Sequence, residues 1–491
     1  MPHAGRGTQS RLPLLVAGAA VSFLAAAEVR DTRLTTVLPL LFFAVLGAFS
    51  YRRFLAWRSL VGLVVAVILF IPIKRYLLPA SLPFQLEPYR IIVFFVIAAW
   101  LATLLIDPRV RLRGTPFDGP ILGYVLAIVF SLLAIYHRVS SLSQDVFKTL
   151  LFFSSFFLLY YLIPSVLRRP REIDYVVTWL AGGGTILGVS AIIESRTGYN
   201  ICSHLSTVMP FLVYEGGANL VRGGHFRAVG SAQHPIAFGA VLIMLAPLAV
   251  YRAEATRQKL WWVAAFLLVV GALATGSRTA ITMLLAVVVV YFVFRPHRLR
   301  RMWPALLPAI VAIHFATPGA LGGTVQAFFP SGGIVAQQSN APVGSARLTT
   351  LGPVLRKEVA PDPVFGEGFG TRITTPSPTT PIPNAPITDD QWLASLAETG
   401  IVGISALVWL FVAYFRRLKR VIRTEESARA QLLAATAASV TSYAVGMLTY
   451  DALSFIQVTF VFFILLALGA SALATSAEEW QHGSAVSPAA A

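Results

Sequence analysis

Two neighbouring carboxylates, Asp389 and Asp390, stand just before an apolar segment that begins near Leu393. A structural role is open to them, because residues 388–391 fit a helix capping box and acidic residues stabilise a first helical turn. A catalytic role is also open, because a carboxylate at the end of a long polar segment can act as a general base. Glu398 follows inside apolar sequence, so we expect it to face the interior of a helical bundle.

Arg278 lies in a predicted extracytoplasmic turn, where the positive-inside rule disfavours a basic residue. It lies in the short polar turn Thr275–Thr279 between two apolar segments, where it must face lipid headgroups, water or a bound anion. An arginine that reaches towards lipid phosphates would give the same pattern. Gly276 and Ser277 beside it permit a tight turn with exposed backbone N–H groups, which is an arrangement that binds anions.

Arg227 is a second candidate for binding an anion, in the polar segment before Pro235. His225 precedes it and His234 follows it, but their spacing does not match that of metal-binding histidines on a helix. A loop histidine is more often a capping residue than a ligand, yet His234 stays a candidate for substrate binding. The pattern predicts no metal site.

Residues 344–359 predict an amphipathic helix at the membrane surface, because apolar residues recur in them at helical spacing. These are Leu348, Leu351, Leu355 and Val359. Arg356 and Lys357 lie near the end of this helix, where cations are favourable in any case. Arg347 lies near its start, so it is the better candidate for function.

Gly366, Gly368 and Gly370 allow the backbone to approach a ligand closely. A flexible turn explains the same residues, and no strand–helix context for a nucleotide-binding loop surrounds them. Arg90 begins an apolar segment and is either an interface anchor or a phosphate contact.

The composition is that of a polytopic membrane protein. Of the 491 residues, 56% are hydrophobic and 12% are charged, whereas roughly a quarter would be charged in a soluble domain. Apolar runs long enough to cross a bilayer recur along the chain without the period-two alternation of a barrel. The net charge of +17 lies in short loops, so it indicates orientation and not nucleic acid binding. Cys202 is the only cysteine, which excludes an intrachain disulfide.

The sequence therefore predicts an all-α transmembrane bundle of about 12–14 spans with a large extracytoplasmic loop. The predicted spans are 12–28, 34–50, 57–73, 90–106, 118–136, 147–166, 174–193, 235–251, 260–275, 279–294, 302–317, 394–415, 429–449 and 452–474. Most of the 39 Lys and Arg residues fall in alternate loops on one side, which predicts cytoplasmic N and C termini.

The predicted spans and loops divide the chain into four parts. Residues 1–318 hold the first eleven spans and an outer loop at 194–234, and residues 319–393 form the large extracytoplasmic loop with its amphipathic helix. Residues 394–475 hold the last spans. Residues 476–491 are small and polar, so we expect a disordered tail.

The order of these segments resembles the O-antigen ligase/polymerase family, the Wzy-type membrane glycosyltransferases. Four elements support the resemblance: R-A-V-G-S-A-Q-H-P (Arg227–Pro235), T-G-S-R-T-A (Thr275–Ala280), the Arg347 helix leading to P-V-F-G-E-G-F-G (Pro363–Gly370), and D-D-Q-W-L-x-x-L-A-E-T-G-I-V-G (Asp389–Gly403). They span roughly residues 220–405, and the N-terminal third is similar only in being multi-helical. Ligases typically have His-Asn where this chain has two aspartates, so polymerase and ligase both stay open.

The resemblance implies a bacterial cytoplasmic membrane enzyme that transfers a glycan from undecaprenyl diphosphate to a glycan or lipid acceptor on the extracytoplasmic face. It implies that Arg227, Arg278 and Arg347, with His234, surround the diphosphate, and that Asp389 or Asp390 is the base. Arg90, Glu398, Gly368 and Gly370 are weaker candidates. Because the donor is already activated, we expect an inverting transfer without metal or nucleotide cofactor.

A polysaccharide flippase or other transporter is the alternative. The number of spans suits a flippase, but transport does not require the loop 319–393. A transporter is also expected to show ionisable residues within its spans and an internal repeat, and this sequence shows little of either.

Overall fold

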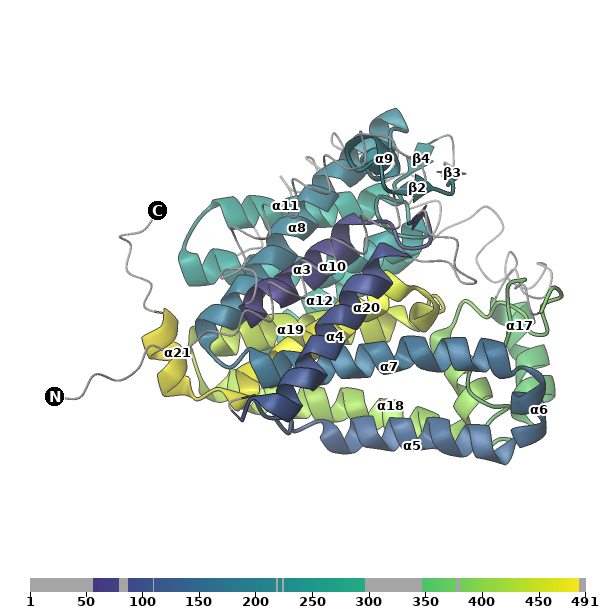
Figure 1. The fold of residues 1–491 in the computed structure, drawn as a ribbon. Helices are drawn as coiled ribbons and strands as arrows, with labels where there is room; N and C mark the ends of the chain where they lie inside the picture. The colour runs from purple at the N-terminus through teal and green to yellow at the C-terminus, as the bar shows by residue number, and fades with distance from the viewer. Residues whose placement is uncertain are drawn as a thin grey trace.

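The computed structural model describes residues 56–78, 87–108, 110–217, 220–222, 225–295, 347–376 and 380–484. In these residues the chain is an all-α bundle, as predicted, with strands confined to two short ribbons (Figure 1). The predicted spans 12–28, 34–50 and 302–317 lie outside the described residues.

Six helices in the described part are long and apolar enough to cross a membrane: α4 (Pro88–Ile106), α7 (Ser143–Val166), α8 (Pro170–Thr197), α10 (Pro235–Thr256), α18 (Gln391–Thr424) and α20 (Ile456–Ala474). Four apolar helices are shorter: α3 (Trp57–Phe70), α5 (Asp118–Ala134), α11 (Leu260–Ala274) and α12 (Arg278–Phe294). Together with α19 (Ala428–Gly446), they coincide with every span predicted inside the described ranges.

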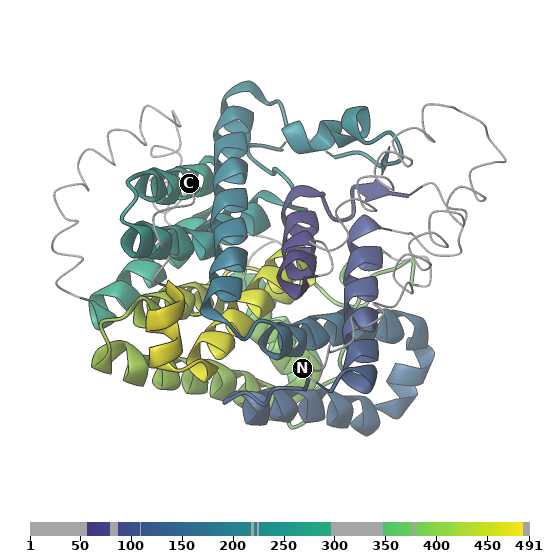
Figure 2. The same ribbon diagram turned by 60° about the vertical axis from the view of Figure 1, so that its left-hand side comes forward.

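The centre of the bundle is formed by α10, α19 and α20. The most apolar stretch of α20 is 94% buried and that of α10 is 83% buried, against 28% for the peripheral α4. A helix that is apolar on all sides is stable in this central place. The exposed Phe94 and Phe95 of α4 lie on its outer surface, where they would meet lipid. In Figure 2 the yellow C-terminal helices lie among helices from the middle of the chain.

Helices α8 and α11 approach each other through glycines. A Cβ added to Gly271 would lie 2.6 Å from the Cα of Gly188, and one added to Gly188 would lie 2.8 Å from the Leu267 carbonyl oxygen. Small residues at such crossings let two backbones come into contact, which is a common way of packing membrane helices.

The polar segment between α8 and α10 has its own local structure. It contains the short helices η1 (Ile201–His204) and α9 (Leu205–Val208), one antiparallel ribbon, and a strand that pairs with a strand from the connection between α3 and α4. Strand β1 (Tyr76–Leu77) pairs with β2 (Val213–Tyr214), and β3 (Leu220–Arg222) pairs with β4 (His225–Arg227). The second ribbon places Arg227 at the end of a strand that leads towards α10.

A helix lies within the predicted amphipathic segment, but its buried face differs from the prediction. Helix α17 (Arg347–Val354) continues into the π-turn η3 (Leu355–Val359), and α6 (Tyr136–Ser141) lies at the same end of the bundle (Figure 1). Val354 is buried against α18, whereas Leu351 and Leu355 of the predicted apolar stripe are exposed. The face is set by contact with α18, which the local periodicity could not reveal.

The prediction of a disordered tail from residue 476 is wrong for residues 477–484, which form α21 (Ala477–Ser484). The Ser476 hydroxyl accepts from the Glu479 backbone N–H at 3.1 Å, and the Glu479 carboxylate accepts from the Ser476 N–H at 3.0 Å. This is a capping box. Trp480 then anchors the helix, since its side chain is only 1% exposed.

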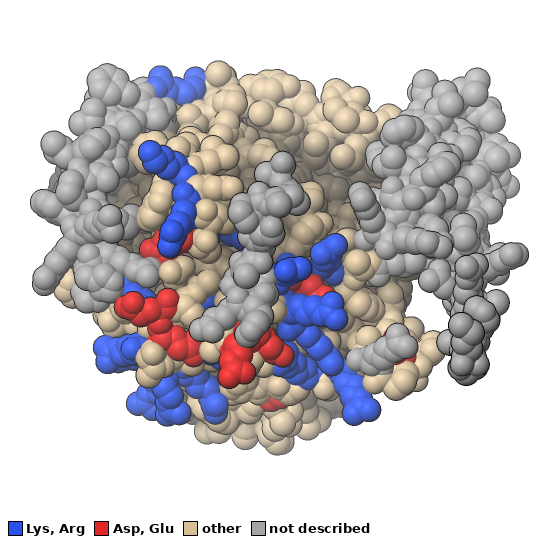
Figure 3. All heavy atoms as spheres, turned by 90° about the vertical axis from the view of Figure 1, so that its left-hand side faces the viewer, with Lys and Arg blue, Asp and Glu red and all other residues tan. Residues whose placement is uncertain are grey.

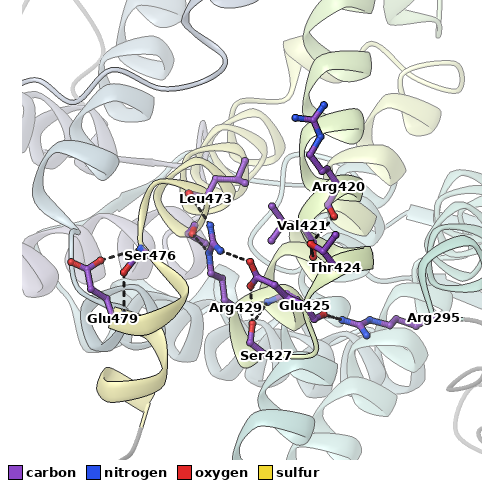
Figure 4. Close-up of polar contacts among 12 residues, drawn as sticks. Arg295, Arg420, Val421, Thr424, Glu425, Ser427, Arg429, Leu473, Ser476 and Glu479 are labelled. Carbon is purple, nitrogen blue, oxygen red and sulfur yellow. Dashed lines mark hydrogen bonds and ion pairs between the residues drawn. The ribbon is translucent and has the colours of Figure 1, made fainter.

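Lys and Arg residues gather, together with several acidic residues, over the end of the bundle that carries α21 (Figure 3). Two buried arginines at this end, Arg429 and Arg295, bind backbone. Arg429 donates from Nε to the Ala472 carbonyl and from Nη2 to the Leu473 carbonyl, both at 2.9 Å, and pairs with Glu425 at 2.7 Å (Figure 4). Arg295 donates to the Glu425 carbonyl at 3.0 Å. Arg429 therefore satisfies carbonyls that the end of α20 leaves without helical partners.

The α8–α11 contact predicts that Gly188→Ala destabilises the protein by about 1–3 kcal/mol, since the added methyl group must displace backbone atoms. Gly182→Ala on the same helix is the control, because no atom lies within 4 Å of the added Cβ. Thermal unfolding in detergent measures both variants. Equal unfolding temperatures for the two would contradict the proposed close contact.

Candidate functional site

Arg227 and Arg278, which are far apart in sequence, are brought to the same turn. Arg227 donates from Nε to the Thr275 carbonyl at 3.0 Å, and its side chain lies along Gly276. Arg278 is the first residue of α12, with Ser277 as its N-cap. The two arginines predicted to bind an anion therefore adjoin a helix N-terminus, which itself favours anions.

Ser277 adds a hydroxyl to this turn. Its side-chain oxygen is buried and has no hydrogen-bond partner within the described part of the chain. A buried polar atom in that state is usually satisfied by water or by a ligand. Ser277 was expected only to permit a tight turn, but its side chain is also suited to bind an oxygen of an anion.

The loop after Arg227 is held by a buried carboxylate. Glu194, near the end of α8, accepts from the Gly230 N–H at 2.8 Å and from the Asn200 amide at 3.0 Å. Gly230 has φ of +53°, and a Cβ there would lie 2.1 Å from the Phe238 ring. Glu194 was not among the predicted site residues, although it is a rare acidic residue near the end of an apolar run.

His234 has a structural role at the start of α10. It is the N-cap residue, and Pro235 follows it as the first helical residue. The Nδ1 of His234 accepts from the Ile236 N–H at 3.2 Å. With Nδ1 as acceptor, a neutral ring carries its proton on Nε2. The cap therefore occupies Nδ1 and gives His234 a structural role at the start of α10.

The two aspartates of the predicted base differ in conformation. Asp390 is the N-cap of α18, and its Oδ1 accepts from the N–H groups of Trp392 at 2.9 Å and Leu393 at 3.2 Å. The cap is thus Asp390 itself and not Thr388, the residue that begins the predicted capping box. Asp389 has φ of +49°, in the left-handed region that aspartate enters more readily than most residues other than glycine. Because the Asp390 carboxylate is occupied as the cap, Asp389 is the better candidate for the base.

The connection between α19 and α20 joins the segment around Asp389 to the turn that contains Arg278. The Asp451 carboxylate accepts from the Thr388 hydroxyl at 2.7 Å and from the Asp390 backbone N–H at 3.2 Å, on both sides of Asp389. Two residues before Asp451, Thr449 donates to the Thr279 hydroxyl at 2.9 Å. A short path of bonded and hydrogen-bonded residues therefore leads from the Arg278 turn to Asp389.

Asp451 was missed in the sequence, although a signal was present. It is the acidic residue in the very short outer turn between the predicted spans 429–449 and 452–474. Further contacts hold the same connection, since the Gln391 N–H donates to the Met447 carbonyl at 2.8 Å. The Leu453 N–H donates to the Gln391 side chain, also at 2.8 Å.

The glycine-rich loop docks on α18 and not on an open site. The Glu367 N–H donates to the Ala397 carbonyl at 2.8 Å, and the Ile401 N–H donates to the Pro363 carbonyl at 2.9 Å. These bonds meet at Gly400, where α18 is kinked. The close approaches at two predicted positions are also internal, with a Cβ on Gly368 3.1 Å from Thr371 and one on Gly370 2.9 Å from Thr149.

Charged residues surround this loop. Arg138 pairs with Glu367 at 2.8 Å, and Arg372 pairs with Glu358 at 2.6 Å. Burial raises the pKa of the Glu367 carboxyl above its usual range, and the positive charge of Arg138 opposes that shift. Glu398 is half-buried and lies within electrostatic range of Arg372 and Asp451. Glu398 therefore belongs to the acidic surroundings of the candidate base.

Two further predicted residues, Arg90 and Arg347, lie on α4 and α17. Arg90 pairs with Glu87 at 2.7 Å and lies 4.9 Å from the centre of the Phe152 ring, so an anchoring role accounts for it. Arg347 is the first residue of α17. That helix packs on α18 through Val354, close to Leu393. The backbone at Arg347 is thus connected to the helix that Asp390 caps.

Comparisons with known proteins add no family to this description. No family model matches the chain, and no curated protein matches it. Among the described residues, no group of three or more His, Cys, Asp or Glu side chains is arranged to hold a metal ion.

We expect Asp451→Ala to destabilise the protein by about 1–3 kcal/mol, because it leaves the buried Thr388 hydroxyl and the Asp390 N–H without their acceptor. Asp451→Asn retains an oxygen acceptor, so it should lower the free energy of unfolding much less. Thermal unfolding in detergent compares the two variants. An equal loss in both would show that the charge of Asp451, and not its hydrogen bonds, stabilises the junction.

Proposed function

We propose that this protein is a membrane glycosyltransferase of cell-surface polysaccharide biosynthesis. It transfers a glycan from undecaprenyl diphosphate to an acceptor hydroxyl on the extracytoplasmic face. The observation that supports this most is the hydrogen-bonded connection from the Arg227–Arg278 turn, through Thr279, Thr449 and Asp451, to the residues on either side of Asp389. An anion-binding group and a candidate base are thereby linked in one part of the bundle.

The arginine turn suits a diphosphate leaving group. Guanidinium groups bind phosphate oxygens through paired N–H donors and stay charged throughout the reaction. The N-terminus of α12 and the Ser277 hydroxyl add donors beside them. Negative charge grows on the diphosphate as the glycosidic bond breaks, so donors fixed at that position stabilise the transition state.

Asp389 is the proposed base. The acceptor hydroxyl oxygen attacks the anomeric carbon while its proton passes to the Asp389 carboxylate. The bond from that carbon to the diphosphate oxygen breaks, and the lipid diphosphate leaves with the bonding electron pair. Attack opposite to the leaving group inverts the anomeric configuration. Asp390 is occupied as the helix cap, and Asp451 positions the peptide segment that contains Asp389.

The acceptor decides between the two forms of this activity. A polymerase would join repeat units to one another, whereas a ligase would move a completed chain to another lipid. Neither the candidate base nor the arginine turn distinguishes them, since both reactions have the same leaving group. A flippase remains the alternative of another class, and it would use the arginines for binding without a base.

We expect Arg278→Ala to abolish glycan transfer in cells, because the leaving group loses a fixed positive charge. Lipid-linked glycans are profiled at equal membrane abundance of the wild type, Arg278→Ala and the control Arg356→Ala, an exposed residue of η3. Accumulated single units on the lipid would identify a polymerase, and accumulated long chains would identify a ligase. Donor retained on the cytoplasmic face would indicate a flippase, and an unchanged profile would remove Arg278 from the mechanism.

The conformations of the two aspartates predict opposite results for Asp389→Asn and Asp390→Asn. Loss of a general base lowers the rate by roughly 10²–10⁴-fold, so Asp389→Asn should be almost inactive. Asparagine is as good an N-cap as aspartate, so Asp390→Asn should retain most of its activity. Initial rates with purified lipid-linked donor test both variants, and the reverse order of rates would assign the base to Asp390.

A further inference from the structure

A groove with a volume of about 330 Å³ lies between α18 and α19, on residues that the proposed reaction does not use. Most of its lining is apolar, with two cations. The lining residues are Phe411, Val412, Phe415, Arg416, Lys419, Val440, Thr441 and Ala444. Its volume is at the lower end of the range for sites that bind small molecules. It is therefore large enough for part of one extended acyl chain.

The walls of the groove are held by the core of the bundle. Phe415 stacks on Phe294 of α12 at a centroid distance of 5.0 Å, and Phe411 lies 5.7 Å from Trp392 and 5.8 Å from Phe462. These aromatic contacts come from α12, from the start of α18 itself and from α20. They pack the two rings that form the apolar wall against the core.

The two cations stand at one end of the apolar wall. On α18 the lining positions recur at intervals of three and four residues, so they lie along a single face of the helix. Phe411 and Phe415 come first, and Arg416 and Lys419 follow towards the basic end of the bundle. Arg416 is exposed and Lys419 is half-buried.

We propose that this groove binds one anionic phospholipid. Its acyl chain would lie along the aromatic wall, and its phosphate would meet Arg416 and Lys419. The proposal follows from charge complementarity on α18, a helix long and apolar enough to cross a membrane, because basic side chains at the edge of an apolar surface attract anionic headgroups. A soluble anion would not require the apolar wall, and a zwitterionic lipid would gain less from two cations. None of the lining residues is assigned a role in the proposed reaction.

Two cations outside the groove provide a matched control. Arg417 belongs to the basic run of α18 and Lys259 precedes α11; both are exposed, and neither lines the groove. At 100° per residue, Arg417 lies on nearly the opposite side of the helix from Phe415 and Lys419. The double variant Lys259→Gln/Arg417→Gln therefore removes the same charge as Arg416→Gln/Lys419→Gln without changing the groove.

The test is native mass spectrometry of the full chain in mild detergent, titrated with phosphatidylglycerol and, separately, with phosphatidylcholine. The wild type should retain one phosphatidylglycerol in preference to phosphatidylcholine. Each basic residue near the membrane surface strengthens such binding by roughly fivefold. The groove variant Arg416→Gln/Lys419→Gln should therefore bind roughly 30-fold more weakly, and the control double variant should bind as the wild type does.

A third variant, Thr441→Phe, tests the apolar part of the groove. It fills the groove and leaves both cations in place, so it should also weaken phosphatidylglycerol binding. Unfolding temperatures without added lipid show that each variant is folded. The proposal is overturned if both double variants lose binding equally, if the wild type does not prefer the anionic lipid, or if folded Thr441→Phe binds normally.

Discussion

The two hydrogen bonds that Asp451 accepts, from Thr388 and from the Asp390 backbone, join the polar segment before α18 to the connection between α19 and α20. That connection also reaches Thr279 at the start of α12 through Thr449. Residues separated by more than a hundred positions are therefore held at one end of the bundle. Without this junction, Asp389 would lie in a polar segment with no fixed relation to the arginine turn.

Helix ends account for many of the polar residues in this chain. Within a bilayer, backbone groups must find partners inside the protein, and the first and last turns of a helix lack them. Asp390 and His234 satisfy N–H groups at the starts of α18 and α10, and Arg429 satisfies carbonyls at the end of α20. Capping accounts for two of the predicted site residues, Asp390 and His234, and leaves Asp389 and the Arg227–Arg278 turn as the more informative ones.

The two ends of the bundle use arginine differently. At the end with α21, Arg429 and Arg295 donate to carbonyls of neighbouring helix ends and pair with glutamates. At the other end, Arg227 donates to the carbonyl of Thr275, in a turn that also presents a helix N-terminus. The first arrangement lies at the carboxyl ends of helices, whereas the second lies at a helix N-terminus, which favours anions. That N-terminus, beside Arg227 and Arg278, supports the proposal that the second end binds a diphosphate.

The sequence by itself determined the helical class, the position of each span in the described ranges and the gathering of basic residues in alternate loops. These properties depend on local hydropathy and charge, which neighbouring residues set. Only the tertiary structure separated Asp389 from Asp390, revealed Asp451 and Glu194, and showed that Gly368 and Gly370 pack on the chain itself. It also showed that Trp480 anchors a terminal helix. Each of these results depends on contacts between segments distant in sequence, and no periodicity or spacing within one segment encodes them.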